Sequence, residues 1–285
     1  MRKALSLCWS LVCCGVVYPA RATGDVKREV RPRELRVCAD PANLPYSNDR
    51  EQGFENQIAS FLAHELHATL SYTWWAQRRG FLRNTLNAGL CDVVIGVPVG
   101  LERAQLTEPY YRSSFAFVTR RDRHLGDLRS LDDARLRELK IGVPLAGDDG
   151  ANPAPAHALS RRGMVSNVIG FSLWGEYERK IPAAVEAVVQ RTLDVALLWG
   201  PLAGASAKKS PEPLTVRLLN EQRDAGIPLA FSIAMAVRES DAPLAAELNA
   251  VIRRRRAALN QILRSAGVPL LDLEPQNREP HHARP

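Results

Sequence analysis

Apolar residues along the chain fall into two kinds of pattern, short nearly continuous runs and longer runs with helical spacing. Residues 92–97 are almost all apolar, which is typical of a strand buried on both faces of a parallel sheet. In residues 54–66 the apolar side chains recur every three or four positions, which predicts an amphipathic helix. The same criteria predict strands at 35–39, 70–74, 114–119, 140–144, 167–171, 194–199, 214–219 and 231–237, and helices at 81–88, 182–191, 201–208 and 243–265.

Strands and helices alternate in this pattern, which predicts an α/β fold. The β-α-β-α-β order over residues 35–97 implies a doubly wound sheet with right-handed crossovers. The strands at 114–119 and 231–237 have the same character, and we expect them to pair as a hinge. The prediction is therefore two doubly wound α/β lobes joined by two hinge crossings. The carboxyl ends of the strands, where ligands bind in such sheets, would face each other across a cleft.

The predicted domain organisation is discontinuous. Lobe one comprises residues 35–121 and 228–272, and lobe two comprises residues 122–227. Residues 23–34 are charged and contain a proline, so we expect a flexible lead-in. The polar residues 273–285 are expected to form a disordered tail.

The first 22 residues have the features of a signal peptide. Arg2 and Lys3 give a positive start, residues 4–17 are apolar, and Ala20-Arg21-Ala22 is an A-x-A cleavage site. We therefore expect export, with cleavage after Ala22. A short membrane anchor is the alternative, but the apolar stretch is shorter than the roughly 20 residues that span a bilayer.

Cleavage would change both the charge and the cysteine content. Loss of Arg2, Lys3 and Arg21 would lower the formal net charge from +7 to +4, a mild excess that does not favour nucleic acid as a partner. Three of the five cysteines would also leave, so that Cys38 and Cys91 remain. Two cysteines in an oxidising compartment predict one disulfide, and their strands are neighbours in the expected 2-1-3 order. Two buried free thiols are the alternative.

Several unusual strings of residues resemble a known family. Residues 91–103 (CDVVIGVPVGLER), followed by Glu108-Pro109-Tyr110-Tyr111, are similar to the signature of bacterial family-3 solute-binding proteins, which have the type II periplasmic binding fold. The closer resemblance is to the quinoprotein (methanol) dehydrogenase-associated binding proteins of the MoxJ/XoxJ type. It is carried by the segments 37–41, 43–48, 53–56 and 72–86, is strong over 35–118, and continues more weakly to 272.

The resemblance implies a periplasmic accessory protein that works beside a PQQ-dependent (methanol or alcohol) dehydrogenase and its cytochrome c. Delivery of a ligand, assistance in maturation and activation of the enzyme all stay open. The alternatives are an ABC-transporter substrate-binding protein for a small solute and a cyclohexadienyl dehydratase-like enzyme on the same scaffold. An acidic group with a perturbed pKa in the cleft would favour the enzyme, with Asp40, Asp148 and Asp149 as candidates.

Two positions bear on the ligand that the resemblance implies. Arg103 stands where amino-acid-binding relatives carry the arginine that grips a carboxylate, at the expected start of a helix; a solvated arginine is the alternative. Trp199 stands where those relatives carry an aspartate that pairs with the ligand ammonium, which argues against a standard amino-acid ligand; a core tryptophan is the alternative. The residues predicted to line the cleft are Asp40, Tyr46, Trp75, Arg78, Pro98, Arg103, Tyr110 and Trp199.

Motifs for catalysis and metal binding are absent from the sequence. It contains no G-x-S-x-G, no P-loop, no H-E-x-x-H and no C-x-x-C-H. His64 and His67 have a possible metal spacing on a helix but no further ligand nearby. We therefore predict a binding protein that is not an enzyme and holds no cofactor. Residues 253–256 are four arginines that circle the last predicted helix, so most should be solvated, and a docking surface for an acidic partner is the alternative.

Overall fold

The structure is a computed structural model that describes residues 33–145, 153–172 and 181–273. The predicted signal peptide, nearly all of the lead-in and the tail, and Asp148 and Asp149 lie outside the described residues. The strands are β1 (Glu34–Ala39), β2 (Ala42–Asn43), β3 (Ser47–Asn48), β4 (Thr69–Trp74), β5 (Val93–Pro98), β6 (Gln105–Leu106), β7 (Tyr111–Arg120), β8 (Ile141–Leu145), β9 (Val168–Ser172), β10 (Val195–Trp199), β11 (Leu214–Leu218), β12 (Arg223–Asp224), β13 (Ile227–Pro228) and β14 (Ala230–Val237). The helices are α1 (Phe54–Glu65), α2 (Phe81–Asn84), α3 (Ala154–Arg161), α4 (Ala183–Val189), α5 (Gly200–Lys209), α6 (Ala242–Arg254) and α7 (Arg256–Ser265), with 3-10 turns η1 (Arg121–Arg123) and η2 (Ala134–Arg137).

The long strands form one mixed sheet in which two parallel sets are joined by antiparallel strands. The order along its main path is β4-β1-β5-β14-β7-β10-β8-β9, with β6 paired to β14 and β11 paired to β7. β1 is parallel to β4 and β5, so the first three long strands have the expected 2-1-3 order. β8 is parallel to β9 and β10. Parallel neighbours need crossover connections, which agrees with the doubly wound prediction.

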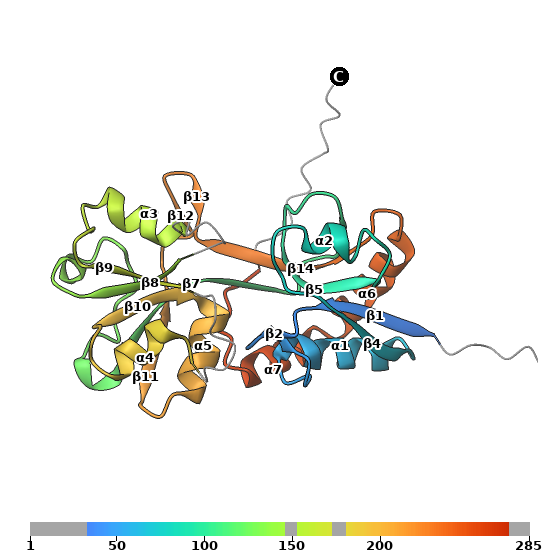
Figure 1. The fold of residues 1–285 in the computed structure, drawn as a ribbon, viewed down its shortest axis with the longest axis horizontal. Coiled ribbons are helices and arrows are strands. Elements are labelled where there is room, and N and C mark those ends of the chain that lie inside the picture. The colour runs from blue at the N-terminus through green and yellow to red at the C-terminus, as the bar shows by residue number, and fades with distance from the viewer. Residues whose placement is uncertain (1–32, 146–152, 173–180, 274–285) are drawn as a thin grey trace, which may run out of the picture. The chain divides into compact units, whose positions relative to one another are not determined.

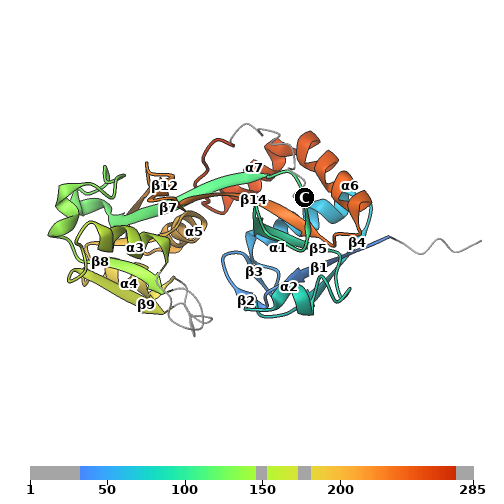
Figure 2. The ribbon, with the colours of Figure 1, turned by 90° about the horizontal axis from the view of Figure 1, so that it is seen from above.

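β7 and β14 run side by side between the two parallel sets (Figures 1 and 2). Ala230 of β14 pairs with Ser114 of β7, and Ile233 pairs with Tyr111. Beyond Ser114, β7 pairs instead with β10 and β11. The predicted pairing of the two crossing strands is therefore confirmed, although β7 begins earlier in the chain than predicted.

The buried apolar residues fall into separate cores. The first core packs α1, α6 and α7 against β1, β5 and β14, and its buried members come from residues 35–111 and 233–268. Two further cores, around β7, β8 and β10, draw their buried members from residues 116–229. The α/β fold class predicted from the sequence is confirmed. The further cores include Ala116, Phe117, Val118 and Leu229, which the predicted boundaries place in lobe one.

The segment after α7 returns along β7 and α5; we call residues 267–271 the carboxyl-terminal return. Leu271 forms a bridge with Arg112 of β7, and its N–H donates to the Arg112 carbonyl at 2.9 Å. A Cβ on Gly204 of α5 would lie 1.9 Å from the carbonyl oxygen of Gly267, so only glycine allows this close approach of the two backbones. The return therefore contacts the crossing strand and a helix of the second group.

The long helix predicted at residues 243–265 is wrong, because α6 and α7 are separate helices that meet at Arg255. Nη2 of Arg254 and Nε of Arg255 both donate to the carboxylate of Glu65, at 3.0 and 2.9 Å. Consecutive side chains on an unbroken helix point about 100° apart, and the break brings both to one carboxylate. Both side chains remain about half exposed, at 53% and 50%, which agrees with the prediction that most of these arginines are solvated.

The helix predicted at residues 81–88 is also shorter than expected. α2 is a single turn, after which Thr85 Oγ1 donates to the carbonyl of Phe81 at 2.7 Å. The chain then turns through Gly89, whose φ of 74° lies in the left-handed region that favours glycine.

Candidate functional site

A pocket of about 330 Å³ opens where the carboxyl ends of β5 and β10, the first turn of α1 and the crossing strands meet. This is the edge at which open α/β sheets bind ligands. Its volume lies at the low end of the roughly 300–1,000 Å³ range of small-molecule sites. The lining residues are Asn43, Tyr46, Glu55, Gln77, Gly96, Pro98, Tyr111, Phe115, Trp199, Phe231 and Ile233.

The first turn of α1 is fixed to the loop before it. A Cβ on Gly53 would lie 1.9 Å from the carbonyl oxygen of Tyr46, so this close contact requires glycine. The N–H of Glu55 donates to the same carbonyl at 2.9 Å. Oδ1 of Asn56 accepts from the N–H groups of Gly53 and Asn48, at 3.0 and 3.1 Å. These bonds place the side chains of Tyr46 and Glu55 at one wall of the pocket.

Glu55 is the acidic residue of the pocket lining, and its carboxyl group lies against Gly96 of β5. A Cβ on Gly96 would lie 2.1 Å from Glu55 Oε1, so the glycine makes room for the carboxyl group. Within the described residues no hydrogen bond reaches this group. Burial raises the pKa of Glu55 to about 8, because desolvation disfavours the charged form. Sequence reasoning missed Glu55 as a site residue, although it lay inside a string that carried the family resemblance.

Two tyrosines near Glu55, Tyr46 and Tyr111, have raised pKa values and stay neutral. Burial raises the pKa of Tyr46 and of Tyr111 above the usual range, and the nearby Glu55 charge adds to the effect. Both line the pocket. They present neutral phenol groups beside the carboxyl at physiological pH.

Trp199 forms the opposite wall together with two phenylalanines. Its ring centroid lies 5.6 Å from those of Phe115 and Phe231, at interplanar angles of 69° and 73°. Trp199 pairs with Phe115 across the β10–β7 ladder and also packs against the first core. The chain then enters α5 at Gly200, where a Cβ would lie 2.5 Å from Ser113 Oγ. This tight start of α5 fixes the position of the indole.

The predicted site residues divide into those at the pocket and those away from it. Tyr46, Pro98 and Trp199 line it. Asp40 lies next to it, and its carboxylate accepts from the N–H groups of Ala42 at 2.8 Å and Gln77 at 2.6 Å, which holds the loop that carries Asn43 and Tyr46. Trp75 and Arg78 are exposed and lie outside the described lining.

Two of these predictions are corrected by the structure. Tyr110 is buried in the first core, where its hydroxyl donates to the carbonyl of Ile95 at 3.2 Å, and its neighbour Tyr111 lines the pocket instead. Successive side chains of a strand point to opposite faces, so the prediction chose the wrong member of the pair. Arg103 is exposed with a left-handed φ of 63°, and the short strand β6 follows it rather than a helix.

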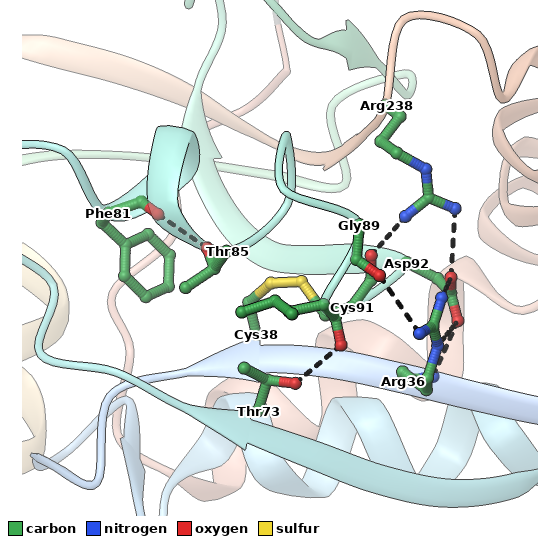
Figure 3. The surroundings of a disulfide bond; sticks show 10 residues. Arg36, Cys38, Thr73, Phe81, Thr85, Gly89, Cys91, Asp92 and Arg238 are labelled. Atoms are coloured by element: carbon green, nitrogen blue, oxygen red, sulfur yellow. Dashed lines mark hydrogen bonds and ion pairs between the residues drawn. A yellow bond between two sulfur atoms is a disulfide. The ribbon is translucent and has the colours of Figure 1, made fainter.

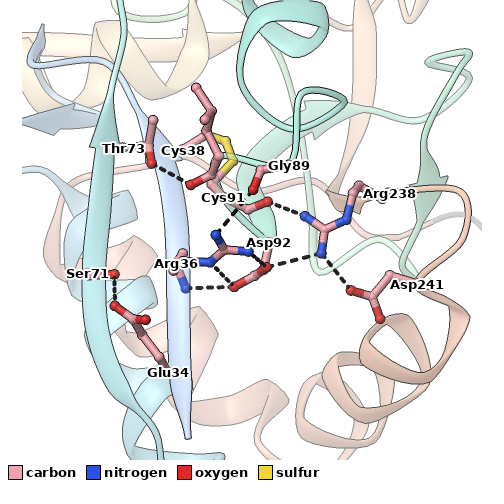
Figure 4. A network of polar contacts seen from close by, with 11 residues as sticks. Glu34, Arg36, Cys38, Ser71, Thr73, Gly89, Cys91, Asp92, Arg238 and Asp241 are labelled. Atoms are coloured by element: carbon pink, nitrogen blue, oxygen red, sulfur yellow. Dashed lines mark hydrogen bonds and ion pairs between the residues drawn. A yellow bond between two sulfur atoms is a disulfide. The ribbon is translucent and has the colours of Figure 1, made fainter.

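The predicted disulfide between Cys38 and Cys91 is confirmed, with a Cα–Cα distance of 5.5 Å. It joins strand β1 to Cys91, two residues before the start of β5 (Figure 3). Next to it, Arg36 and Arg238 both bind the carboxylate of Asp92 (Figure 4). Covalent and ionic links therefore hold the first parallel set together beneath the pocket.

The described ranges contain neither a candidate metal site nor a candidate membrane span. There, no group of three His, Cys, Asp or Glu residues could hold a metal ion. In the same residues no helix has the length and hydropathy needed to cross a bilayer.

Known proteins resemble this chain over most of its length. Protein MoxJ of Paracoccus denitrificans is 32% identical over 254 residues, which are 83% of this chain and 89% of the relative. The crystal structure of periplasmic binding protein XoxJ from Methylobacterium extorquens AM1 is 37% identical, with a TM-score of 0.68 over 84% of this chain and all of the other. The crystal structure of MxaJ from Methlophaga aminisulfidivorans MPT is 29% identical with a TM-score of 0.68, over 83% of this chain and all of that one. No protein-family model matches the chain.

Proposed function

Since this chain belongs to the family of periplasmic binding proteins that includes MoxJ and XoxJ, we propose that it works in the periplasm as a binding accessory of a PQQ-dependent methanol or alcohol dehydrogenase and its cytochrome c. Export is supported by the Ala20-Arg21-Ala22 cleavage motif. It is also supported by the disulfide between Cys38 and Cys91, because disulfides persist in oxidising compartments.

The observation that carries a binding role is the pocket of about 330 Å³ at the junction of the crossing strands. Its walls come from α1 and β5 on one side and from Trp199 and Phe115 on the other, which belong to separate groups of strands. A ligand there would touch both groups. We propose residues 35–121 with 228–272 and residues 122–227 as the two lobes that hold it. The first core, whose buried members come from residues 35–111 and 233–268, supports the discontinuous first lobe.

Affinity capture tests the partner. The mature chain, tagged and immobilised, is incubated with periplasmic extract of its own source organism grown on methanol. We expect enrichment of a quinoprotein dehydrogenase or its cytochrome c over a control column that carries an unrelated binding protein of the same fold. Absence of both from the captured fraction under every growth condition would overturn the proposal.

A second candidate function, a dehydratase-like enzyme, is favoured by Glu55. A buried carboxyl with a pKa of about 8 is protonated at neutral pH and suits a general acid that protonates a leaving hydroxyl. Incubation with a cyclohexadienol substrate would then give an aromatic product, detected by its ultraviolet absorbance, and Glu55→Gln would abolish it. No product from the unsubstituted protein at high enzyme concentration rules this candidate out. The solute receptor of a transporter remains the alternative binding role, and it uses the same pocket.

A further inference from the structure

We propose that the pocket binds an organic monocation of the alkylammonium type, without a carboxylate group, held between the Glu55 carboxylate and the aromatic wall of Trp199, Phe115 and Phe231. This inference rests on the proposed binding function and names the class of ligand. It follows from three features of the described lining: its charge, its aromatic content and the position of the nearby arginines.

The charge of the lining is one-sided. Glu55 is its acidic residue, and none of the described lining residues is lysine, arginine or histidine. A buried carboxylate without a partner is costly, since desolvation is not repaid by an ion pair or hydrogen bonds. A cation that enters beside Glu55 supplies the missing counter-charge. An anionic ligand would find no counter-charge among the described lining residues.

The wall opposite Glu55 suits the alkyl groups of such a cation. Aromatic rings attract cations through the negative charge of their faces, and aromatic cages are a recurring way to bind quaternary ammonium groups. Phe115 and Phe231 each pack edge to face against Trp199, with ring centroids 5.6 Å from that of the indole. Tyr46 and Tyr111 extend this aromatic surface towards Glu55. The pocket thus joins one carboxyl group to several rings.

A ligand carboxylate has no counterpart among these residues. Arg103 and Arg78, the arginines predicted for the cleft, lie outside the described lining. An amino acid would therefore bring a carboxylate that no described lining residue neutralises. The expected ligand carries positive charge alone.

Binding of a cation should be coupled to loss of a proton. The groups near Glu55 from the neighbouring elements are Tyr46, Gly96, Tyr110 and Tyr111. The three tyrosines stay neutral because burial raises the pKa of each. Asn43 and Gln77 carry no charge. Because the pKa of Glu55 is about 8, the free protein holds this proton at pH 7, and the bound cation favours its release. Affinity should rise about tenfold per pH unit below that value and level off above it.

Isothermal titration calorimetry of the mature full-length chain tests this with three matched probes. Choline is the cationic probe. Its carbon isostere, in which carbon replaces the ammonium nitrogen, has the same shape without the charge. Glycine betaine carries the same cationic group together with a carboxylate. We expect choline to bind at least about tenfold more tightly than the other two. Titration in buffers of different ionisation enthalpy should show release of close to one proton near neutral pH. Equal affinity for choline and its isostere would overturn the proposal.

Two variants test whether Glu55 is the group that binds the cation. Glu55→Gln should weaken choline binding at least about tenfold and remove its pH dependence, whereas Glu239→Gln, an exposed carboxyl outside the lining, should leave both unchanged. If Glu55→Gln fails to fold, the isostere comparison and the proton release decide with the unsubstituted chain. No binding of choline or tetramethylammonium at millimolar concentration, with the dehydrogenase still captured, defeats this inference but leaves the proposed function standing. Cation binding without capture of the dehydrogenase or its cytochrome c would support this inference and overturn the proposed partner.

Discussion

Arg36 and Asp92 form a bidentate ion pair between the neighbouring strands β1 and β5, with Nε to Oδ2 at 3.0 Å and Nη2 to Oδ1 at 2.6 Å (Figure 4). Nη2 of Arg238, just after β14, reaches the same carboxylate at 3.1 Å and also binds Asp241. Burial works to raise the pKa of Asp92, but the hydrogen bonds from Arg36 and Arg238 outweigh it and lower the pKa below its usual value.

Asp92→Asn should therefore destabilise the fold. The amide cannot neutralise the two guanidinium groups, and we expect a loss of about 1–3 kcal/mol at neutral pH by chemical denaturation. Because the folded pKa is lowered, this stabilisation is present at neutral pH and is lost as pH falls below about 4. The gap between the two proteins should then shrink in acid. A constant gap over that range would contradict the assignment.

Removal of the disulfide should lower stability at neutral pH. Cys38 and Cys91 are separated by 53 positions, and loop-closure entropy over such a span corresponds to about 4 kcal/mol. We expect a Cys38→Ala, Cys91→Ala double variant to unfold at a correspondingly lower denaturant concentration. Reductant should destabilise the unsubstituted protein and leave the double variant unaffected. Labelling of these two thiols in the unfolded, unreduced mature chain would show that they are not bonded.

Glu55→Gln should stabilise the protein at alkaline pH. The unfolded chain loses the Glu55 proton near pH 4.3, whereas the folded chain keeps it until about pH 8. Between these values the unfolded state binds fewer protons, so the free energy of unfolding falls as pH rises. The variant lacks this loss and should be more stable near pH 8 by on the order of 4–5 kcal/mol. Urea titrations at several pH values measure the difference, and parallel pH profiles would argue against a buried carboxyl.

Gly204→Ala should weaken the contact between α5 and the carboxyl-terminal return. The new methyl group would lie 1.9 Å from the Gly267 carbonyl oxygen, and backbone must move to relieve the clash. We expect a loss of about 1–3 kcal/mol in thermal or chemical unfolding. Gly126→Ala is the matched control, because its methyl would lie 3.3 Å from a side-chain carbon of Thr215, which can shift. Equal effects of the two changes would mean that the close approach is not tight.

The main elements could be predicted where local pattern determines structure. The apolar runs that became β5 and β10 were located to within a residue, because burial on both faces leaves little choice of side chain. α3 was missed, since Pro153 and Pro155 suggest a loop although proline is tolerated in the first turn of a helix. At the break between α6 and α7, Arg254 and Arg255 bind Glu65, which is about 190 positions earlier in the chain, and no local pattern reports such a contact.

The pocket was only partly predictable for the same reason. Trp199, Tyr46 and Pro98 follow strand ends, where a ligand edge is expected, and they do line it. The choice between Tyr110 and Tyr111 depended on which face of β7 each side chain takes, and this is set by the pairing with β14. Glu55 acquires its properties from Gly96 on another strand, a neighbour that only the folded chain supplies.

The carboxyl-terminal return is a third connection between the two groups of strands, in addition to β7 and β14. The strands β7 and β14 alone could bend together at little cost. The return also contacts Gly204 of α5 and Arg112 of β7, and these contacts resist that bend. Wide opening of the pocket therefore requires the return to detach from these contacts first, which is a local unfolding step. Entry and escape of a bound molecule would then depend on residues 267–271, which are far in sequence from Tyr46 and Glu55 of the pocket.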